Sequence, residues 1–133
     1  TTPFLMPDCT HAYYMYPIIL DTKQLGVTRE VLVKALQAEG VTGLANGYQN
    51  VHLLPMFQKK VAYGSNGFPW SSDICHSKVN YDKGICPVAE KLHEETYLGF
   101  SMCLHDLSDA DVDLIAQAFN KVWLQLDKLK AKN

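Results

Sequence analysis

The chain has 133 residues, of which 47% are hydrophobic and 20% charged, a composition typical of a globular domain rather than a disordered chain. Its formal net charge of −2 gives no sign of a nucleic-acid-binding surface, and its apolar runs are too short to cross a bilayer. We therefore expect one domain over residues 1–133, with neither a nucleic acid nor a membrane as partner.

The start of the chain and its cysteines bear on its origin. The first residue is Thr1 rather than Met, which fits either a chain freed from a tag or a piece excised from a longer protein. Wide spacing without a CxxC pair favours free thiols in a cytoplasmic protein for Cys9, Cys75, Cys86 and Cys103. Histidines close to three of them do not repeat with the spacing of a structural zinc site, so no metal is expected.

The expected elements alternate between strands and helices. A strand over 13–20 precedes a helix that Thr28 caps and Gly40 ends, and a weaker strand covers 41–48. A helix starts at Pro87 in "PVAEKLHEET", a strand covers 97–104, and a long helix follows Ser108 through residue 130. This order predicts an α+β fold: a small open α/β sandwich with a three- or four-stranded, mostly antiparallel sheet and helices packed on one side.

The stretch 58–85 has little periodicity yet carries Tyr63, Phe68, Trp70 and Tyr81. Irregular segments of that length are uncommon in compact domains. Two interpretations remain open. Either the stretch has its own short helix near 55–62 and folds its aromatic side chains back, or these side chains rest on a surface that this chain does not include.

Three stretches stand out for their residue types. "HAYYMYPIIL" (11–20) places polar-tipped aromatic residues before an apolar strand, although core strands usually carry side chains without hydroxyls. "GYQNVHLLPMF" (47–57) indicates a loop that presents the phenol of Tyr48 and the imidazole of His52, although a lone histidine is more often a local structural residue. "GICPVAEKLH" (84–93) looks structural, and "HEET" (93–96) looks like the solvated face of a helix.

Taken together, these segments resemble the C-terminal small domain of DegT/DnrJ/StrS-type sugar aminotransferases, which are PLP enzymes of fold type I. The resemblance lies in "THAYYMYPIILD" and its following helix, in "GYQNVHLLPMFQ", in "YDKGICPVAEKLHEE" and in "FSMCLHDLSDADVDLIAQAFNKV". Each motif is weak alone, but all four occur in the family's order and span nearly the whole chain.

The resemblance implies that the PLP-binding lysine, the aspartate at the pyridine nitrogen and the phosphate-binding loop belong to a large domain outside this chain. No PLP is then expected on this chain alone, which should be inactive by itself. The resemblance also implies substrate-facing roles: Tyr14 first, Tyr13 and His11 next, and Tyr48 and His52 as residues facing the site or a dimer partner. Tyr14 stands where many relatives carry a histidine. Alternatively, Tyr14 and Tyr16 pack against the large domain.

Two functions follow as expectations. The first is part of a homodimeric, cytoplasmic aminotransferase that moves an amino group from glutamate or glutamine to a nucleotide-linked keto-sugar or a keto-cyclitol. Its product would enter cell-surface polysaccharide, for instance lipopolysaccharide, or a secondary metabolite. The second is a non-catalytic α+β domain that binds a ligand or another protein.

Overall fold

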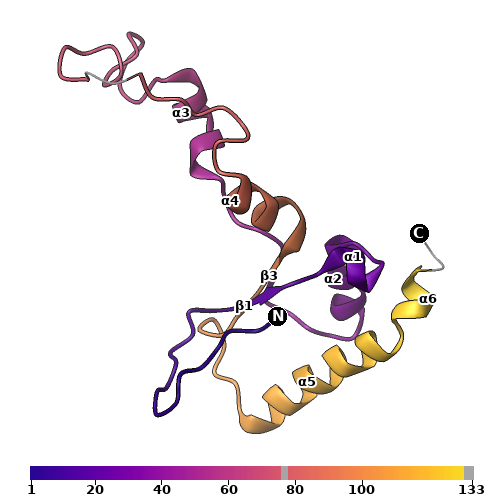
Figure 1. The fold of residues 1–133 in the computed structure, drawn as a ribbon. Coiled ribbons are helices and arrows are strands. Elements are labelled where there is room, and N and C mark those ends of the chain that lie inside the picture. Colours follow the sequence, from indigo (N-terminus) through magenta and orange to yellow (C-terminus); the bar gives the residue numbers. More distant parts are fainter. Residues whose placement is uncertain (76–77, 131–133) are drawn as a thin grey trace. The chain divides into compact units, whose positions relative to one another are not determined.

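The computed structural model describes residues 1–75 and 78–130, and the chain divides into two compact units (Figure 1). The first unit comprises Thr1–Gly47 and Glu94–Asn133, and the second comprises Tyr48–His93. No helix in the described part of the chain is long and apolar enough to span a membrane. The cysteines of that part form no disulfide.

The first unit contains a three-stranded antiparallel sheet, as the sequence predicts. The strands are β1 (Met15–Ile19), β2 (Leu44–Ala45) and β3 (Tyr97–Ser101), in the order β1-β3-β2. Each is shorter than its expected range. Pro17 of β1 lies opposite Gly99 of β3. Because β1 is an edge strand, it tolerates a proline, which has no backbone N–H to donate.

In the described part of the first unit the sheet is accompanied by the α-helices α1 (Thr22–Leu25), α2 (Arg29–Ala38), α5 (Asp109–Leu124) and α6 (Leu126–Lys130). The Thr28 side chain accepts the N–H of Val31, and Ser108 forms a reciprocal capping box with Asp111. Both caps confirm the predicted helix starts.

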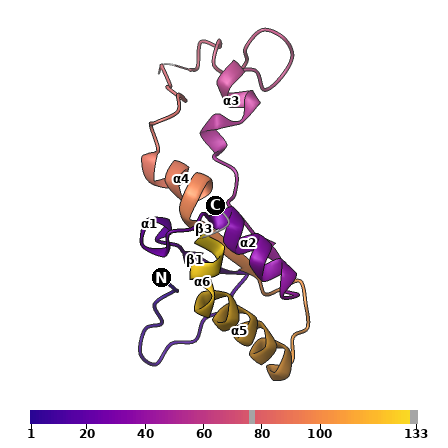
Figure 2. The same ribbon diagram turned by 90° about the vertical axis from the view of Figure 1, so that its right-hand side faces the viewer.

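The expected single helix after Ser108 is wrong in one respect, because it breaks at Gln125. The φ of this residue is −113°, outside the helical range. Beyond the break, Leu126 and Leu129 of α6 pack against the core, so the change of direction places both side chains in contact with it. Figure 2 shows α6 at the end of α5, with α2 beside them.

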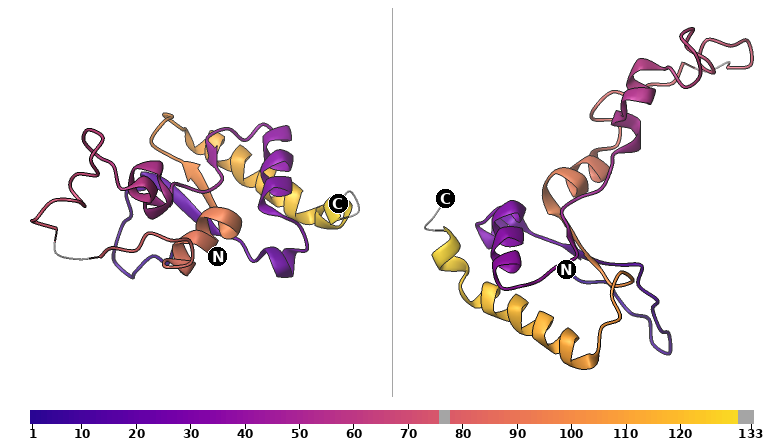
Figure 3. Two further views of the ribbon diagram at one scale, coloured as in Figure 1. Left: turned by 90° about the horizontal axis from the view of Figure 1, so that it is seen from above. Right: turned by 180° about the vertical axis from the view of Figure 1, so that it is seen from behind.

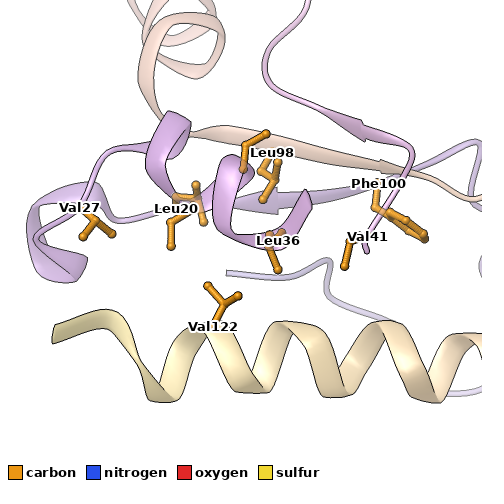
Figure 4. Close-up of a cluster of buried hydrophobic side chains, with 9 residues drawn as sticks. Leu20, Val27, Leu36, Val41, Leu98, Phe100 and Val122 are labelled. Carbon is orange, nitrogen blue, oxygen red and sulfur yellow. The ribbon is translucent and has the colours of Figure 1, made fainter. Parts of the chain in front are cut away.

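The core lies on one face of the sheet. Leu98 and Phe100 of β3 both point toward this face, where they meet Leu36 of α2 and Val122 of α5 (Figure 4). Leu32 of α2 belongs to the same buried cluster. Because α2 and α5 both contribute to this core face, the helices cover one side of the sheet. This confirms the predicted α+β class.

The second unit is mostly irregular. Its helices are the 3-10 turn η1 (Val51–Leu53), α3 (Pro55–Lys59) and α4 (Pro87–Lys91). The π-helical turn η2 (Leu92–Thr96) follows α4 and ends in the first unit, so the predicted helix from Pro87 is interrupted after one turn. The long stretch between α3 and α4 is visible in Figure 3.

An aromatic cluster anchors part of that stretch. Trp70 donates its indole N–H to the hydroxyl of Tyr81 at 3.1 Å, and both rings pack around Phe57, with centroids 6.0 and 5.2 Å from the Phe57 ring. The short helix near 55–62 is confirmed as α3, and Trp70 and Tyr81 fold back onto Phe57 of this helix. Tyr63 contacts Phe68 but remains 73% exposed.

Candidate functional site

The first group of candidate residues is a ladder of aromatic rings that leads into β1. The rings of His11 and Tyr13 stack with centroids 4.0 Å apart and an interplanar angle of 4°. Tyr13 in turn meets the ring of Tyr16 edge-on at 4.8 Å. Tyr16 packs against the hydrophobic core, whereas His11 is exposed. The ladder therefore runs from the core surface to solvent.

Tyr14 interrupts this ladder in sequence and remains outside the stack. Its side chain is 72% exposed, although the residues on either side of it are partly buried. An exposed phenol offers both a flat apolar face and a hydroxyl, which together suit stacking on a sugar ring and hydrogen bonding to its hydroxyls. Tyr14 is thus accessible to a ligand in this unit.

The second group lies in the second unit and centres on Glu90, which is only 5% exposed. Its carboxylate accepts both the backbone N–H of Gly84, at 2.8 and 2.9 Å, and that of Cys86, at 3.3 Å. The same carboxylate contacts Nε2 of His52 at 2.9 Å. A buried carboxylate is costly unless it is hydrogen-bonded, and these contacts meet that requirement.

The contacts also determine the electrostatics of Glu90. Burial alone raises the pKa of its carboxyl group, but the hydrogen bonds from Gly84, His52 and Cys86 outweigh this effect. The pKa of Glu90 therefore lies below its ordinary value of 4.5. Glu90 is held as a carboxylate that fixes the turn at Gly84–Cys86 and the ring of His52.

Tyr48 and His52 differ in accessibility. The His52 side chain is 11% exposed and bound to Glu90, whereas Tyr48 is 75% exposed. The backbone N–H of Tyr48 is donated to Nδ1 of His93 at 2.8 Å. The structure therefore places each of the two candidates against a partner on the segment 90–93.

Sequence reasoning missed Glu90 and His93 as partners. "GICPVAEKLH" is structural, as expected, but the interpretation of "HEET" as a solvated helix face is wrong for two of its residues: His93 is partly buried and Thr96 is 7% exposed. No sequence signal points to these pairings, because Tyr48 and His93 are 45 positions apart and His52 and Glu90 are 38 positions apart.

The described residues do not fit a PLP site. Every lysine whose burial is described is exposed, and PLP chemistry needs a lysine held in a site with a charged partner for the pyridine nitrogen. The buried carboxylate of Glu90 is already bound by His52 and two backbone N–H groups. Among the described residues no group of three or more metal-ligating side chains is found, and His76 lies outside them.

Comparison with known proteins shows which family the chain belongs to. The profile of the DegT/DnrJ/EryC1/StrS aminotransferase family matches residues 2–97, which include both groups of candidate residues. The chain belongs to this family. The spore coat polysaccharide biosynthesis protein SpsC of Bacillus subtilis (strain 168) is 37% identical over 68 residues. The matched stretch is 51% of this chain and 18% of SpsC, so the chain spans only a small part of that relative.

Proposed function

We propose that this chain is the C-terminal small domain of a PLP-dependent sugar aminotransferase. The whole protein would transfer an amino group from glutamate or glutamine to a nucleotide-linked keto-sugar or a keto-cyclitol. Three observations support the proposal: family membership, the polysaccharide role in the name of SpsC, and the small share of that relative that the chain spans. The product would be used in polysaccharide or secondary-metabolite biosynthesis, in the cytoplasm.

In this proposal the cofactor is held elsewhere. PLP supplies an electron sink for amino-group transfer when a lysine and a pyridine-nitrogen partner hold it, and the large domain would contribute both. The family's aminotransferase chemistry together with the exposed lysines of this chain supports that division. We expect the large domain to belong to the same polypeptide and the whole protein to form a homodimer.

The role of this chain would be to recognise the sugar. The observation that carries this role is the exposed ring of Tyr14, which lies outside the His11–Tyr13 stack. An exposed aromatic ring can stack on the apolar face of a sugar, and its hydroxyl can hydrogen-bond the sugar hydroxyls. Tyr48 is also exposed, and its side chain would face the substrate or a dimer partner.

The proposal is tested with the longer protein that we expect to contain this chain. Purified with PLP, it is given glutamate or glutamine as donor and a panel of nucleotide-linked keto-sugars and keto-cyclitols as acceptors. The proposal predicts amino-group transfer to at least one acceptor, detected by mass spectrometry, whereas residues 1–133 alone show none. Absence of transfer to every acceptor, with either donor, would overturn it and favour a non-catalytic binding domain.

A further inference from the structure

The second unit is closed where the chain enters and leaves it. Tyr48 is its first residue and His93 its last, and the 2.8 Å hydrogen bond from the Tyr48 backbone N–H to Nδ1 of His93 joins these two ends. This contact joins two residues that are 45 positions apart in the sequence and lie at the two ends of the unit. We call this contact the neck bond.

The neck bond requires one protonation state of the imidazole. A backbone N–H can only donate, so Nδ1 of His93 must carry a free lone pair. The ring is therefore neutral, with its proton on Nε2. If Nδ1 gains a proton, two donors face each other and the bond is lost.

A second contact runs beside the neck bond. His52 meets Glu90 at 2.9 Å, so the segment 48–52 is held to the segment 90–93 at two points. The two contacts differ chemically. Protonation of His52 leaves its Nε2 as a donor to the Glu90 carboxylate, whereas protonation of His93 removes an acceptor. Acid therefore acts on the neck bond and leaves the neighbouring contact in place.

We propose that His93 is a positioning residue whose neutral imidazole holds the backbone of Tyr48 at the base of the second unit. Protonation of His93 releases Tyr48 while Glu90 keeps His52. The importance of Tyr48 for a substrate rests on the proposed function, but the neck bond itself does not. The charged groups along the same helical segment are Glu90, which is engaged by Gly84 and His52, and the exposed Lys91, Glu94 and Glu95.

Two substitutions at residue 93 distinguish the presence of a hydrogen-bond acceptor from the protonation of an imidazole. In His93→Asn the amide oxygen stands close to where Nδ1 was, so it accepts the Tyr48 N–H but does not titrate. In His93→Ala the acceptor is absent at every pH. His105→Asn, at an exposed histidine of the first unit, is the matched control. All are made in residues 1–133.

The measurement is nuclear magnetic resonance of the 15N-labelled chain between pH 5 and 8. At pH 8 we expect a scalar coupling across the bond between the Tyr48 amide and Nδ1 of His93, with the ring proton on Nε2. Wherever the ring-nitrogen signals show that the His93 ring carries two protons, the coupling should be absent and hydrogen exchange at Tyr48, corrected for intrinsic rate, should be roughly twofold to tenfold faster. His93→Asn should keep slow exchange at pH 5, and His93→Ala should exchange fast throughout.

Protonated Nδ1 at pH 8 would overturn the proposal, as would equal Tyr48 exchange in the wild type and His93→Ala. Equal acid acceleration in His93→Asn would also overturn it, because that variant has no imidazole to protonate. These results are independent of catalysis. An intact neck bond in a protein without aminotransferase activity would refute the proposed function only, and an active protein without the bond would refute this inference only.

Discussion

The hydroxyl of Tyr97 lies 2.7 Å from the position that a Cβ at Gly99 would occupy. Sδ of Met15, on the neighbouring strand, lies 2.8 Å from the same point. Tyr97, Gly99 and Met15 thus meet on the face of the sheet opposite Leu98 and Phe100. Burial raises the pKa of the Tyr97 phenol, in keeping with its closely packed surroundings.

We expect Gly99→Ala to destabilise the first unit by about 1–3 kcal/mol, because the rigid Tyr97 ring has to move. Urea unfolding measures the change. The double variant Tyr97→Phe/Gly99→Ala removes the hydroxyl and should recover part of the loss, a coupling that additive effects would not produce. Full additivity of the two substitutions would show that the close approach does not matter.

Arg29 connects the start of α2 to the chain entering β3. It is 5% exposed and donates to the carbonyl of Glu94 at 2.9 Å and that of Tyr97 at 3.2 Å. Arg29→Met keeps much of the apolar stem but removes these donors, so we expect a loss of about 1–3 kcal/mol in the free energy of unfolding. Lys34→Met, on the exposed face of the same helix, should change it by less than about 0.5 kcal/mol. Equal effects of the two variants would show that the carbonyl contacts contribute nothing.

Glu90 should make stability depend on pH in the acid range. The pKa of its carboxyl is lower in the folded chain than the ordinary 4.5, so its contribution is fully present above about pH 4.5. The contribution is lost as the pH falls through the lower pKa of the folded state. Thermal unfolding should therefore show wild type more stable than Glu90→Gln at pH 7, with the difference shrinking below pH 4.5.

Glu95→Gln, at an exposed glutamate nearby in sequence, is the control for the Glu90 experiment. It should leave the pH dependence of unfolding close to that of the wild type. A difference between wild type and Glu90→Gln that stays constant from pH 7 to pH 3 would contradict the role of Glu90 as a hydrogen-bonded carboxylate.

The sequence predicts best the features that are local in the chain. The caps at Thr28 and Ser108 depend only on the next three residues. Both predicted helices begin directly after these caps. The break at Gln125 is different, because it depends on where Leu126 and Leu129 reach the core. Periodicity alone continues the helix through that point.

The candidate sites show the same division. Tyr48 and His52 are visible as residue types, but their partners His93 and Glu90 are 45 and 38 positions away and need the folded second unit. Likewise, alternation places Tyr13 and Tyr14 on different sides, whereas the parallel stack of His11 on Tyr13 depends on the irregular backbone before β1. No local pattern encodes either contact.

Tyr14→Phe tests substrate recognition in the longer protein. The change keeps the ring and removes one uncharged hydroxyl, an interaction of about 0.5–1.5 kcal/mol. The kcat/KM for the keto-sugar should fall roughly threefold to tenfold, while the half-reaction with the amino donor changes little. Stability should hardly change, since the side chain is 72% exposed.

Tyr63→Phe, at a similarly exposed tyrosine of the second unit, is the matched control for Tyr14→Phe and should leave both half-reactions unchanged. An unchanged sugar half-reaction in Tyr14→Phe would exclude a hydrogen bond from its hydroxyl to the substrate. Tyr14 would then be a residue that packs against another part of the protein.

We propose that this chain shapes the sugar pocket of an aminotransferase whose cofactor is bound outside residues 1–133. The most direct test treats the longer protein and the isolated chain with PLP and borohydride, then maps the modified lysine by mass spectrometry. We predict one stoichiometric modification in the longer protein, at a lysine beyond residues 1–133, and no site-specific modification of the isolated chain. A single stoichiometric modification at a lysine within residues 1–133 would contradict a cofactor site outside this chain.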